Sequence, residues 1–114
     1  MITIYHNPRC SKSRATLKIL EEKGIQPIII EYLQTPPNAA MLDGFLGKLG
    51  IDPRQLMRRG EAPYEELNLA DDSKDRTALI EAMVANPILI ERPIVVNGEK
   101  VALGRPPENV LGIL

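Results

Sequence analysis

The chain opens with a strand–helix–strand pattern, in which residues 2–32 read ITIYHNPRCSKSRATLKILEEKGIQPIIIEY. Ile2–Tyr5 alternates apolar and polar residues and predicts a short strand, which ends at Asn7-Pro8-Arg9. A helix is expected from about Ser11 to Lys23, and the apolar Pro27–Tyr32 predicts a second strand. This order within about 30 residues is typical of a βαβ unit, so we expect the two strands to be parallel.

The first predicted helix has an apolar face and a stop signal. Ala15, Ile19 and Leu20 are expected on the face that packs against the strands. Gly24 stands where a glycine commonly ends a helix in the left-handed conformation.

The middle of the chain, from about residue 35 to 90, is predicted to be helical. Thr35–Asn38 is a start signal for a helix that Gly50 ends, Asp52-Pro53 opens a shorter helix through about Arg58, and Pro63–Leu67 is a candidate further turn. Two apolar stripes are interpreted as core-facing surfaces: Met41, Leu42, Phe45, Leu46 and Leu49, and then Leu79, Ile80, Met83 and Val84.

The last part of the chain returns to strands. Ile94–Val96 and Glu99–Leu103 flank Asn97-Gly98, the signature of a type I′ hairpin turn, and the residues after Pro106-Pro107 predict a closing helix. With the helical block set aside, the order βαβ then ββα is that of a thioredoxin-like α/β fold with a mixed four-stranded sheet. We therefore predict a single domain over residues 1–114, with a helical insertion at about 35–90.

Composition excludes several classes of protein. The 114 residues are 44% hydrophobic and 25% charged, as in a globular domain, and the net charge of −1 gives no reason to expect nucleic-acid binding. No apolar run has the length of a membrane span, and Met1–His6 lacks the features of a secretion signal. We expect a cytoplasmic protein with no nucleic-acid or membrane partner.

Cys10 is the only cysteine, which excludes an internal disulfide and a multi-cysteine zinc site; with one histidine, no metal site is expected. It lies between the first strand and the first helix. The free amides of Ser11, Lys12 and Ser13 and the helix dipole would favour a thiolate, so a lowered thiol pKa is expected. The alternative is a small buried apolar side chain, against which the position in a loop argues.

The residues that follow Cys10 argue against two kinds of thiol chemistry. A dithiol oxidoreductase needs a second cysteine where this chain has Ser13, and a phosphatase-type loop needs an arginine where it has Thr16. A monothiol nucleophile remains, whose covalent adduct must be resolved by a thiol from another molecule.

Arginines form the second group of candidates. In a thioredoxin-like fold the loop before the third strand often carries a cis proline that faces the active cysteine, and Arg92-Pro93 stands at that place. Arg92 would then reach the sulfur, Arg105 could reach the same edge, and guanidinium groups suit tetrahedral oxyanions. Solvated surface arginines are the alternative, and Arg58 and Arg59 could instead interact with a helix C-terminus.

His6, the only histidine, has two interpretations. It could stabilise the Cys10 thiolate as an imidazolium, or it could orient the loop by hydrogen bonding at the end of the first strand.

Several motifs together resemble one known family. Tyr5–Arg14 (YHNPRCSKSR) is similar to the active-site signature of the glutaredoxin-coupled arsenate reductases, in particular their short, YfgD-like members. The similarity extends over essentially the whole chain, through the following motifs: Leu56-Met57-Arg58, Pro63-Tyr64-Glu65, Asn86–Ile90, Arg92–Val96 and Gly104-Arg105-Pro106.

The resemblance implies a mechanism and a set of partners. Cys10 would attack arsenate, glutathione as co-substrate would displace the thiol–arsenate ester to a mixed adduct, and glutaredoxin would reduce that adduct, with no bound cofactor. The arginines that bind the oxyanion in the family match Arg58, Arg92 and Arg105, with Arg58 preferred over Arg59 from the register of Pro63-Tyr64. The residues that assist the thiolate match His6, Ser13 and Arg14.

Two other functions stay open from the sequence. One is a monothiol reductase acting on glutathionylated substrates. The other is a binding module for RNA polymerase, because the Spx-type regulators resemble this family but carry a second cysteine where this chain has Ser13.

Overall fold

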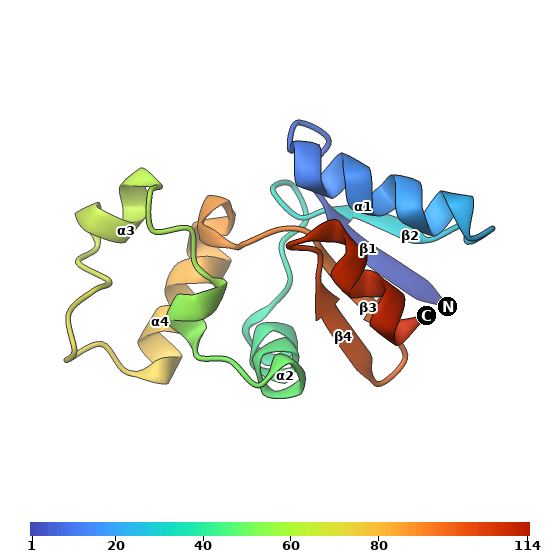
Figure 1. Ribbon diagram of the computed structural model, residues 1–114. Coiled ribbons are helices and arrows are strands. Elements are labelled where there is room, and N and C mark those ends of the chain that lie inside the picture. The colour runs from blue at the N-terminus through green and yellow to red at the C-terminus, as the bar shows by residue number, and fades with distance from the viewer. The chain divides into compact units, whose positions relative to one another are not determined.

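The computed structural model describes all residues from Met1 to Leu114, which form two compact units (Figure 1). The first unit joins residues 1–35 to residues 92–114, and the second is residues 36–91, close to the insertion expected at about 35–90. The prediction that both belong to a single domain stays a prediction. None of the helices has both the length and the apolar character needed to cross a membrane.

The first unit contains the strands and two of the helices. They are β1 (Ile2–His6), α1 (Ser11–Glu22), β2 (Ile28–Glu31), β3 (Ile94–Asn97), β4 (Lys100–Leu103) and the 3-10 helix η3 (Pro107–Ile113). The sheet has the order β2-β1-β3-β4, with β1 and β2 parallel and the other two pairs antiparallel. This is the mixed four-stranded sheet of the predicted thioredoxin-like α/β fold, which is therefore confirmed.

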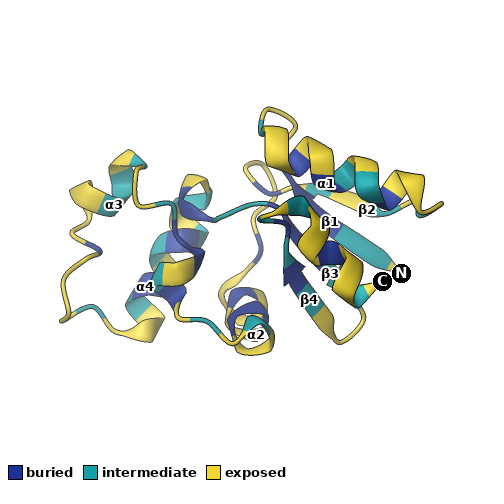
Figure 2. Ribbon diagram, in the orientation of Figure 1, coloured by how far each residue is buried: buried dark blue, intermediate teal, exposed yellow.

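Two helices close one face of this sheet. Ile4, Val95 and Ala102 are direct neighbours across β1, β3 and β4, so their side chains point to the same face. They form one buried cluster with Leu20 of α1 and Val110 of η3 (Figure 2). Burial of these apolar side chains is what holds the strands and helices of the first unit together.

The buried face of α1 differs from the predicted one. Leu20 is buried and Ile19 packs against the core, but Ala15 is exposed, and Ser13 and Thr16 are fully buried in its place. The two polar side chains tolerate burial because each has a hydrogen-bond partner: Ser13 Oγ lies 2.6 Å from His6 Nδ1, and Thr16 Oγ1 donates to the Lys12 carbonyl at 2.8 Å.

The hairpin turn is also shifted from the prediction. Asn97 pairs with Lys100 inside the ladder, so the two turn residues are Gly98 and Glu99 rather than Asn97 and Gly98. Only Gly98 has a positive φ, of 60°, which is the pattern of a type II′ turn and not of type I′. Asn97 is held in the strand because its side-chain amide donates to the carbonyl of Ile113 at 2.6 Å.

The second unit consists of short helices. They are α2 (Ala39–Leu49), the 3-10 helix η1 (Pro53–Leu56), α3 (Ala62–Glu66), α4 (Arg76–Ala85) and the 3-10 helix η2 (Pro87–Leu89). Asn38 and Asp75 cap α2 and α4 by accepting from the amides of Met41 and Ala78, each at 2.8 Å. The two helices pack on each other through the predicted stripes, of which Leu42, Phe45, Leu46, Leu79, Ile80 and Met83 are buried.

The end predicted for the helix that starts at Asp52, at about Arg58, is wrong. The helix stops at Leu56, and Met57 is extended in an isolated antiparallel bridge with Ile90. The amide of Arg58 donates to Leu89 and the amide of Glu91 to Leu56, each at 2.7 Å. These pairings with a segment distant in sequence compete with the helical pattern, and Arg58 consequently lies in a loop.

Gly104 is packed so closely that it allows no side chain. A Cβ there would lie 2.5 Å from Thr16 Oγ1 and 2.8 Å from Pro93 Cγ, and the Gly104 amide donates to the Pro93 carbonyl at 2.9 Å. Gly104→Ala is expected to lower the free energy of unfolding by about 1–3 kcal/mol, the usual cost of overpacking. Urea unfolding of the wild type and the variant measures this change in the free energy of unfolding.

The matched control is Gly112→Ala, whose added methyl meets nothing within 4 Å. It should leave the free energy of unfolding unchanged or raise it by up to about 1 kcal/mol, because alanine restricts the unfolded chain more than glycine does. A Gly104→Ala protein as stable as the Gly112→Ala protein would contradict the packing described here.

Candidate active site

The strand pairing brings several candidate residues to one end of the sheet. Tyr5 near the end of β1 pairs with Ile94 at the start of β3, which pairs with Leu103 at the end of β4. The loop after β1, the residues before β3 and the residues after β4 therefore leave the sheet at the same end. They carry Cys10, Arg92 and Arg105.

Cys10 is the residue immediately before α1. Its backbone is extended, its carbonyl accepts the first helical hydrogen bond from Arg14 at 3.0 Å, and its side chain is half-buried. The amides of Ser13 and Lys12 point toward the sulfur, as expected at a helix N-terminus. The thiol is thus neither fully buried nor free in solvent.

The environment of Cys10 favours the thiolate. Burial raises the pKa of the Cys10 thiol, but the Ser13 amide, the Arg92 guanidinium and the Lys12 amide lower it, so that the net shift is downward from the ordinary value. Arg92 acts both as a hydrogen-bond donor to the sulfur and as a positive charge.

Arg92 and Arg105 come from two loops that each contain a cis proline. The Arg92–Pro93 and Arg105–Pro106 peptide bonds are both cis. The Arg92 side chain reaches the Cys10 sulfur, and its Nε is buried without a hydrogen-bond partner. Arg105 donates to the carbonyl of Arg92 at 3.5 Å. An unsatisfied buried guanidinium donor beside a thiolate is suited to binding an oxyanion.

Ser13 and Arg14 brace the loop that carries Cys10. Ser13 Oγ accepts from the Asn7 amide at 3.0 Å, and the Arg14 guanidinium donates to the Pro8 carbonyl at 2.9 Å. Within the loop, the Cys10 amide donates to the Asn7 carbonyl at 3.0 Å. These contacts fix the loop conformation, so both side chains act on Cys10 through the backbone.

His6 is buried at the end of β1. Burial lowers the pKa of His6, Glu31 raises it and Arg14 lowers it, with a net downward shift that favours the neutral ring at neutral pH. Its Nδ1 lies 2.6 Å from Ser13 Oγ. This geometry supports the loop-orienting interpretation of His6 over the imidazolium one.

Arg58 lies in the second unit. Its guanidinium is 2.6 Å from a carboxylate oxygen of Glu61 and 3.6 Å from one of Glu91. Arg59, its neighbour, is exposed. No group of three or more His, Cys, Asp and Glu side chains is arranged to hold a metal ion.

Sequence reasoning missed the residues that shape the site without reacting. Gly104 packs closely against Thr16 and Pro93, and neither Gly104 nor Thr16 carries a chemical signal in the sequence. The position of Gly104 directly before Arg105-Pro106 is the one hint that the chain gives.

The lowered pKa predicts the reactivity of Cys10. The rate of alkylation by iodoacetamide should rise with pH to a midpoint below the value of about 8.5 that is usual for a free thiol. Free glutathione, alkylated under the same conditions, is the control. A midpoint for Cys10 at or above that of the control would mean that the thiol is not activated.

Comparison with known proteins places these features in a family context. The model of the ArsC family matches residues 5–113. A protein named YfgD from Escherichia coli is 56% identical over 114 residues, which cover 99% of this chain and 96% of that protein. An arsenate reductase from Haemophilus influenzae is 52% identical, with 99% and 98% covered.

Solved structures named as arsenate reductases are also similar to this chain over nearly its whole length. An arsenate reductase from Vibrio cholerae superposes with a TM-score of 0.95 at 50% identity, covering 99% of this chain and 97% of that one. A putative arsenate reductase from Yersinia pestis gives a TM-score of 0.93 at 53% identity, with 98% and 99% covered.

Proposed function

The chain belongs to the ArsC family, and we propose that it reduces arsenate to arsenite through a covalent adduct on Cys10. The observation that carries the proposal is the convergence of the Arg92 guanidinium and the Lys12 and Ser13 amides on the only thiol of the chain. Proteins about 50% identical over the full chain are named arsenate reductases, which supports the choice of arsenate as substrate.

The first step forms a sulfur–arsenic bond. The Cys10 thiolate attacks arsenic, and an arsenic-bound hydroxyl leaves as water after taking up a proton. We assign binding of the arsenate oxygens to Arg92 and Arg105, because guanidinium groups bind tetrahedral oxyanions through paired hydrogen bonds. Arg58, the third arginine that the family resemblance implies, stays a prediction. The amides at the start of α1 would hold a further oxygen.

Two external thiols then supply the electrons. Glutathione attacks arsenic and displaces a second water, giving an adduct with both Cys10 and glutathione attached. A thiol of glutaredoxin attacks the glutathione sulfur, so that a mixed disulfide leaves and As(V) becomes As(III). Hydrolysis of the remaining sulfur–arsenic bond releases arsenite and Cys10. Glutathione is thus a co-substrate, no cofactor is bound, and the reducing cytoplasm is the fitting compartment.

The partners are tested by omission. Arsenite formation is measured with glutathione and glutaredoxin together and with each left out in turn. We expect that omission of glutathione stops repeated turnover and omission of glutaredoxin slows it. Arsenite formation at the full rate when either thiol is left out would contradict the requirement for that thiol.

A further inference from the structure

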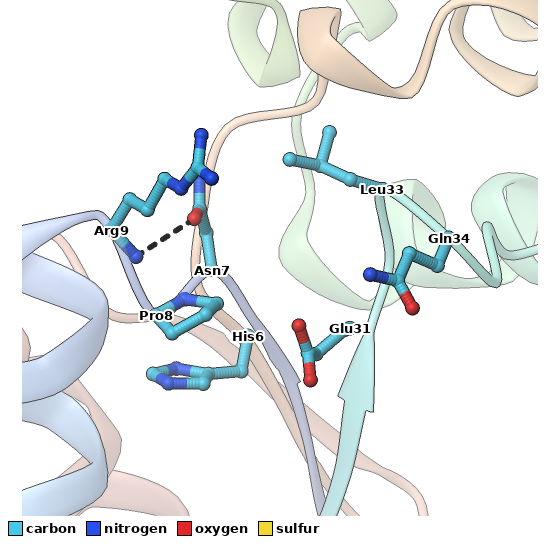
Figure 3. A pocket seen from close by; sticks show the side chains of 7 residues that line it. All are labelled: His6, Asn7, Pro8, Arg9, Glu31, Leu33 and Gln34. Atoms are coloured by element: carbon cyan, nitrogen blue, oxygen red, sulfur yellow. Dashed lines mark hydrogen bonds between the residues drawn. The ribbon is translucent and has the colours of Figure 1, made fainter.

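A pocket opens beside the loop that carries Cys10. Its volume is about 360 Å³, and its walls include Asn7 and Arg9 from the loop and Glu31, Leu33 and Gln34 from the end of β2 and the segment after it (Figure 3). Cys10 itself does not line the pocket, but it directly follows Arg9 and its amide is bonded to the Asn7 carbonyl.

The two sides of the pocket carry opposite charges. Figure 3 shows Arg9 on the loop side and Glu31 and Gln34 on the strand side. Arg9 and Glu31 are exposed, and neither makes an ion pair. A tetrahedral dianion would be repelled by Glu31, so this pocket is not suited to arsenate. A ligand with both an ammonium and a carboxylate group would satisfy both sides.

The presence of only one cysteine in the chain indicates the chemical role of such a ligand. Any adduct on Cys10 has to be resolved by a thiol from another molecule, because the chain has no second cysteine. The resolving thiol must therefore approach the Cys10 loop. Arg9 directly precedes Cys10, so a thiol compound of di- or tripeptide size that is seated against Arg9 would lie beside the residue that carries the adduct.

We infer that this pocket binds the small resolving thiol, with its ammonium group on Glu31, its carboxylate on Arg9 and its methylene groups along Leu33. Leu33 is 45% exposed and offers the apolar contact. The inference rests on the proposed function only for the need to resolve an adduct on Cys10, and its test requires no arsenate.

The test uses a disulfide between Cys10 and thionitrobenzoate, made with Ellman's reagent. The incoming thiolate attacks the Cys10 sulfur, a new disulfide forms, and the coloured thionitrobenzoate leaves with the electron pair of the broken bond. Release is followed with glutathione, cysteamine, mercaptopropionate and mercaptoethanol. Each rate is divided by the mercaptoethanol rate of the same variant, because mercaptoethanol has neither an ammonium nor a carboxylate group.

Each charge should affect its own class of thiol. Glu31→Gln is expected to lower the normalised rates of glutathione and cysteamine by about two- to fivefold, the upper part of the range of a solvent-exposed ion pair, without lowering that of mercaptopropionate. Arg9→Gln should lower the normalised rates of glutathione and mercaptopropionate by a similar factor and leave cysteamine unchanged. The matched control is Glu22→Gln on the exposed surface of α1, which should change none of them.

Normalised rates of glutathione that are the same in wild type, Glu31→Gln and Arg9→Gln would overturn the inference. So would a loss shared equally by cysteamine and mercaptopropionate in either variant. A protein that shows the predicted thiol selectivity but forms no arsenite would contradict the proposed function and leave the pocket assignment standing.

Discussion

Cys10→Ser is expected to abolish arsenate reduction, with a loss of about 10³-fold or more, the scale on which removal of a covalent nucleophile acts. The serine hydroxyl stays protonated at neutral pH, so the sulfur–arsenic adduct cannot form. The measurement is the initial rate of arsenite formation with glutathione and glutaredoxin in excess.

The control for this variant is its stability. Cys10 is half-buried at the start of α1, and serine is similar in size and is a preferred residue at that position, so Cys10→Ser should keep the free energy of unfolding within about 1 kcal/mol of the wild type. Arsenite formation by the folded variant at a rate comparable to wild type would show that the reaction does not pass through Cys10.

Arg92→Ala is expected to have the next largest effect, because one guanidinium serves two purposes. It stabilises the Cys10 thiolate, and its buried, unpartnered Nε is a donor for the substrate. Loss of charge-assisted hydrogen bonds of about 1.5–3 kcal/mol corresponds to a 10- to 150-fold decrease in kcat/KM for arsenate. The midpoint of Cys10 alkylation should move to higher pH in the same protein.

Two further variants separate charge from geometry. Arg92→Lys keeps the positive charge but not the planar fork, so it should restore most of the alkylation midpoint and little of the arsenate kcat/KM. Arg59→Ala removes an exposed arginine and should alter neither quantity. Equal losses in Arg92→Ala and Arg59→Ala would mean that Arg92 has no special place at the sulfur.

Elements governed by local signals could be predicted from the sequence. The start of α1 at Ser11, the start signal that ends at Asn38 and the stop at Gly50 follow from neighbouring residues alone. The position of Cys10 between β1 and α1 follows in the same way, and with it the expectation of amides near the sulfur.

Features decided by contacts between distant segments could not. Hydrophobic periodicity predicts Ala15 on the buried face of α1. The structure buries Ser13 and Thr16 there instead, because both hydroxyl groups have hydrogen-bond partners. The bridge between Met57 and Ile90 ends a helix that the local pattern would continue. The close packing of Gly104 brings together the two ends of the β3–β4 hairpin and Thr16 of α1, which is distant in sequence, so no local pattern predicts it.

The proposed activity is tested by measuring arsenite formation from arsenate by the purified wild-type protein, with both glutathione and glutaredoxin present. We predict many arsenite molecules formed per protein molecule, in a reaction that prior alkylation of Cys10 stops. If a protein whose Cys10 alkylates readily forms no more arsenite than the protein-free mixture, the protein does not reduce arsenate through Cys10.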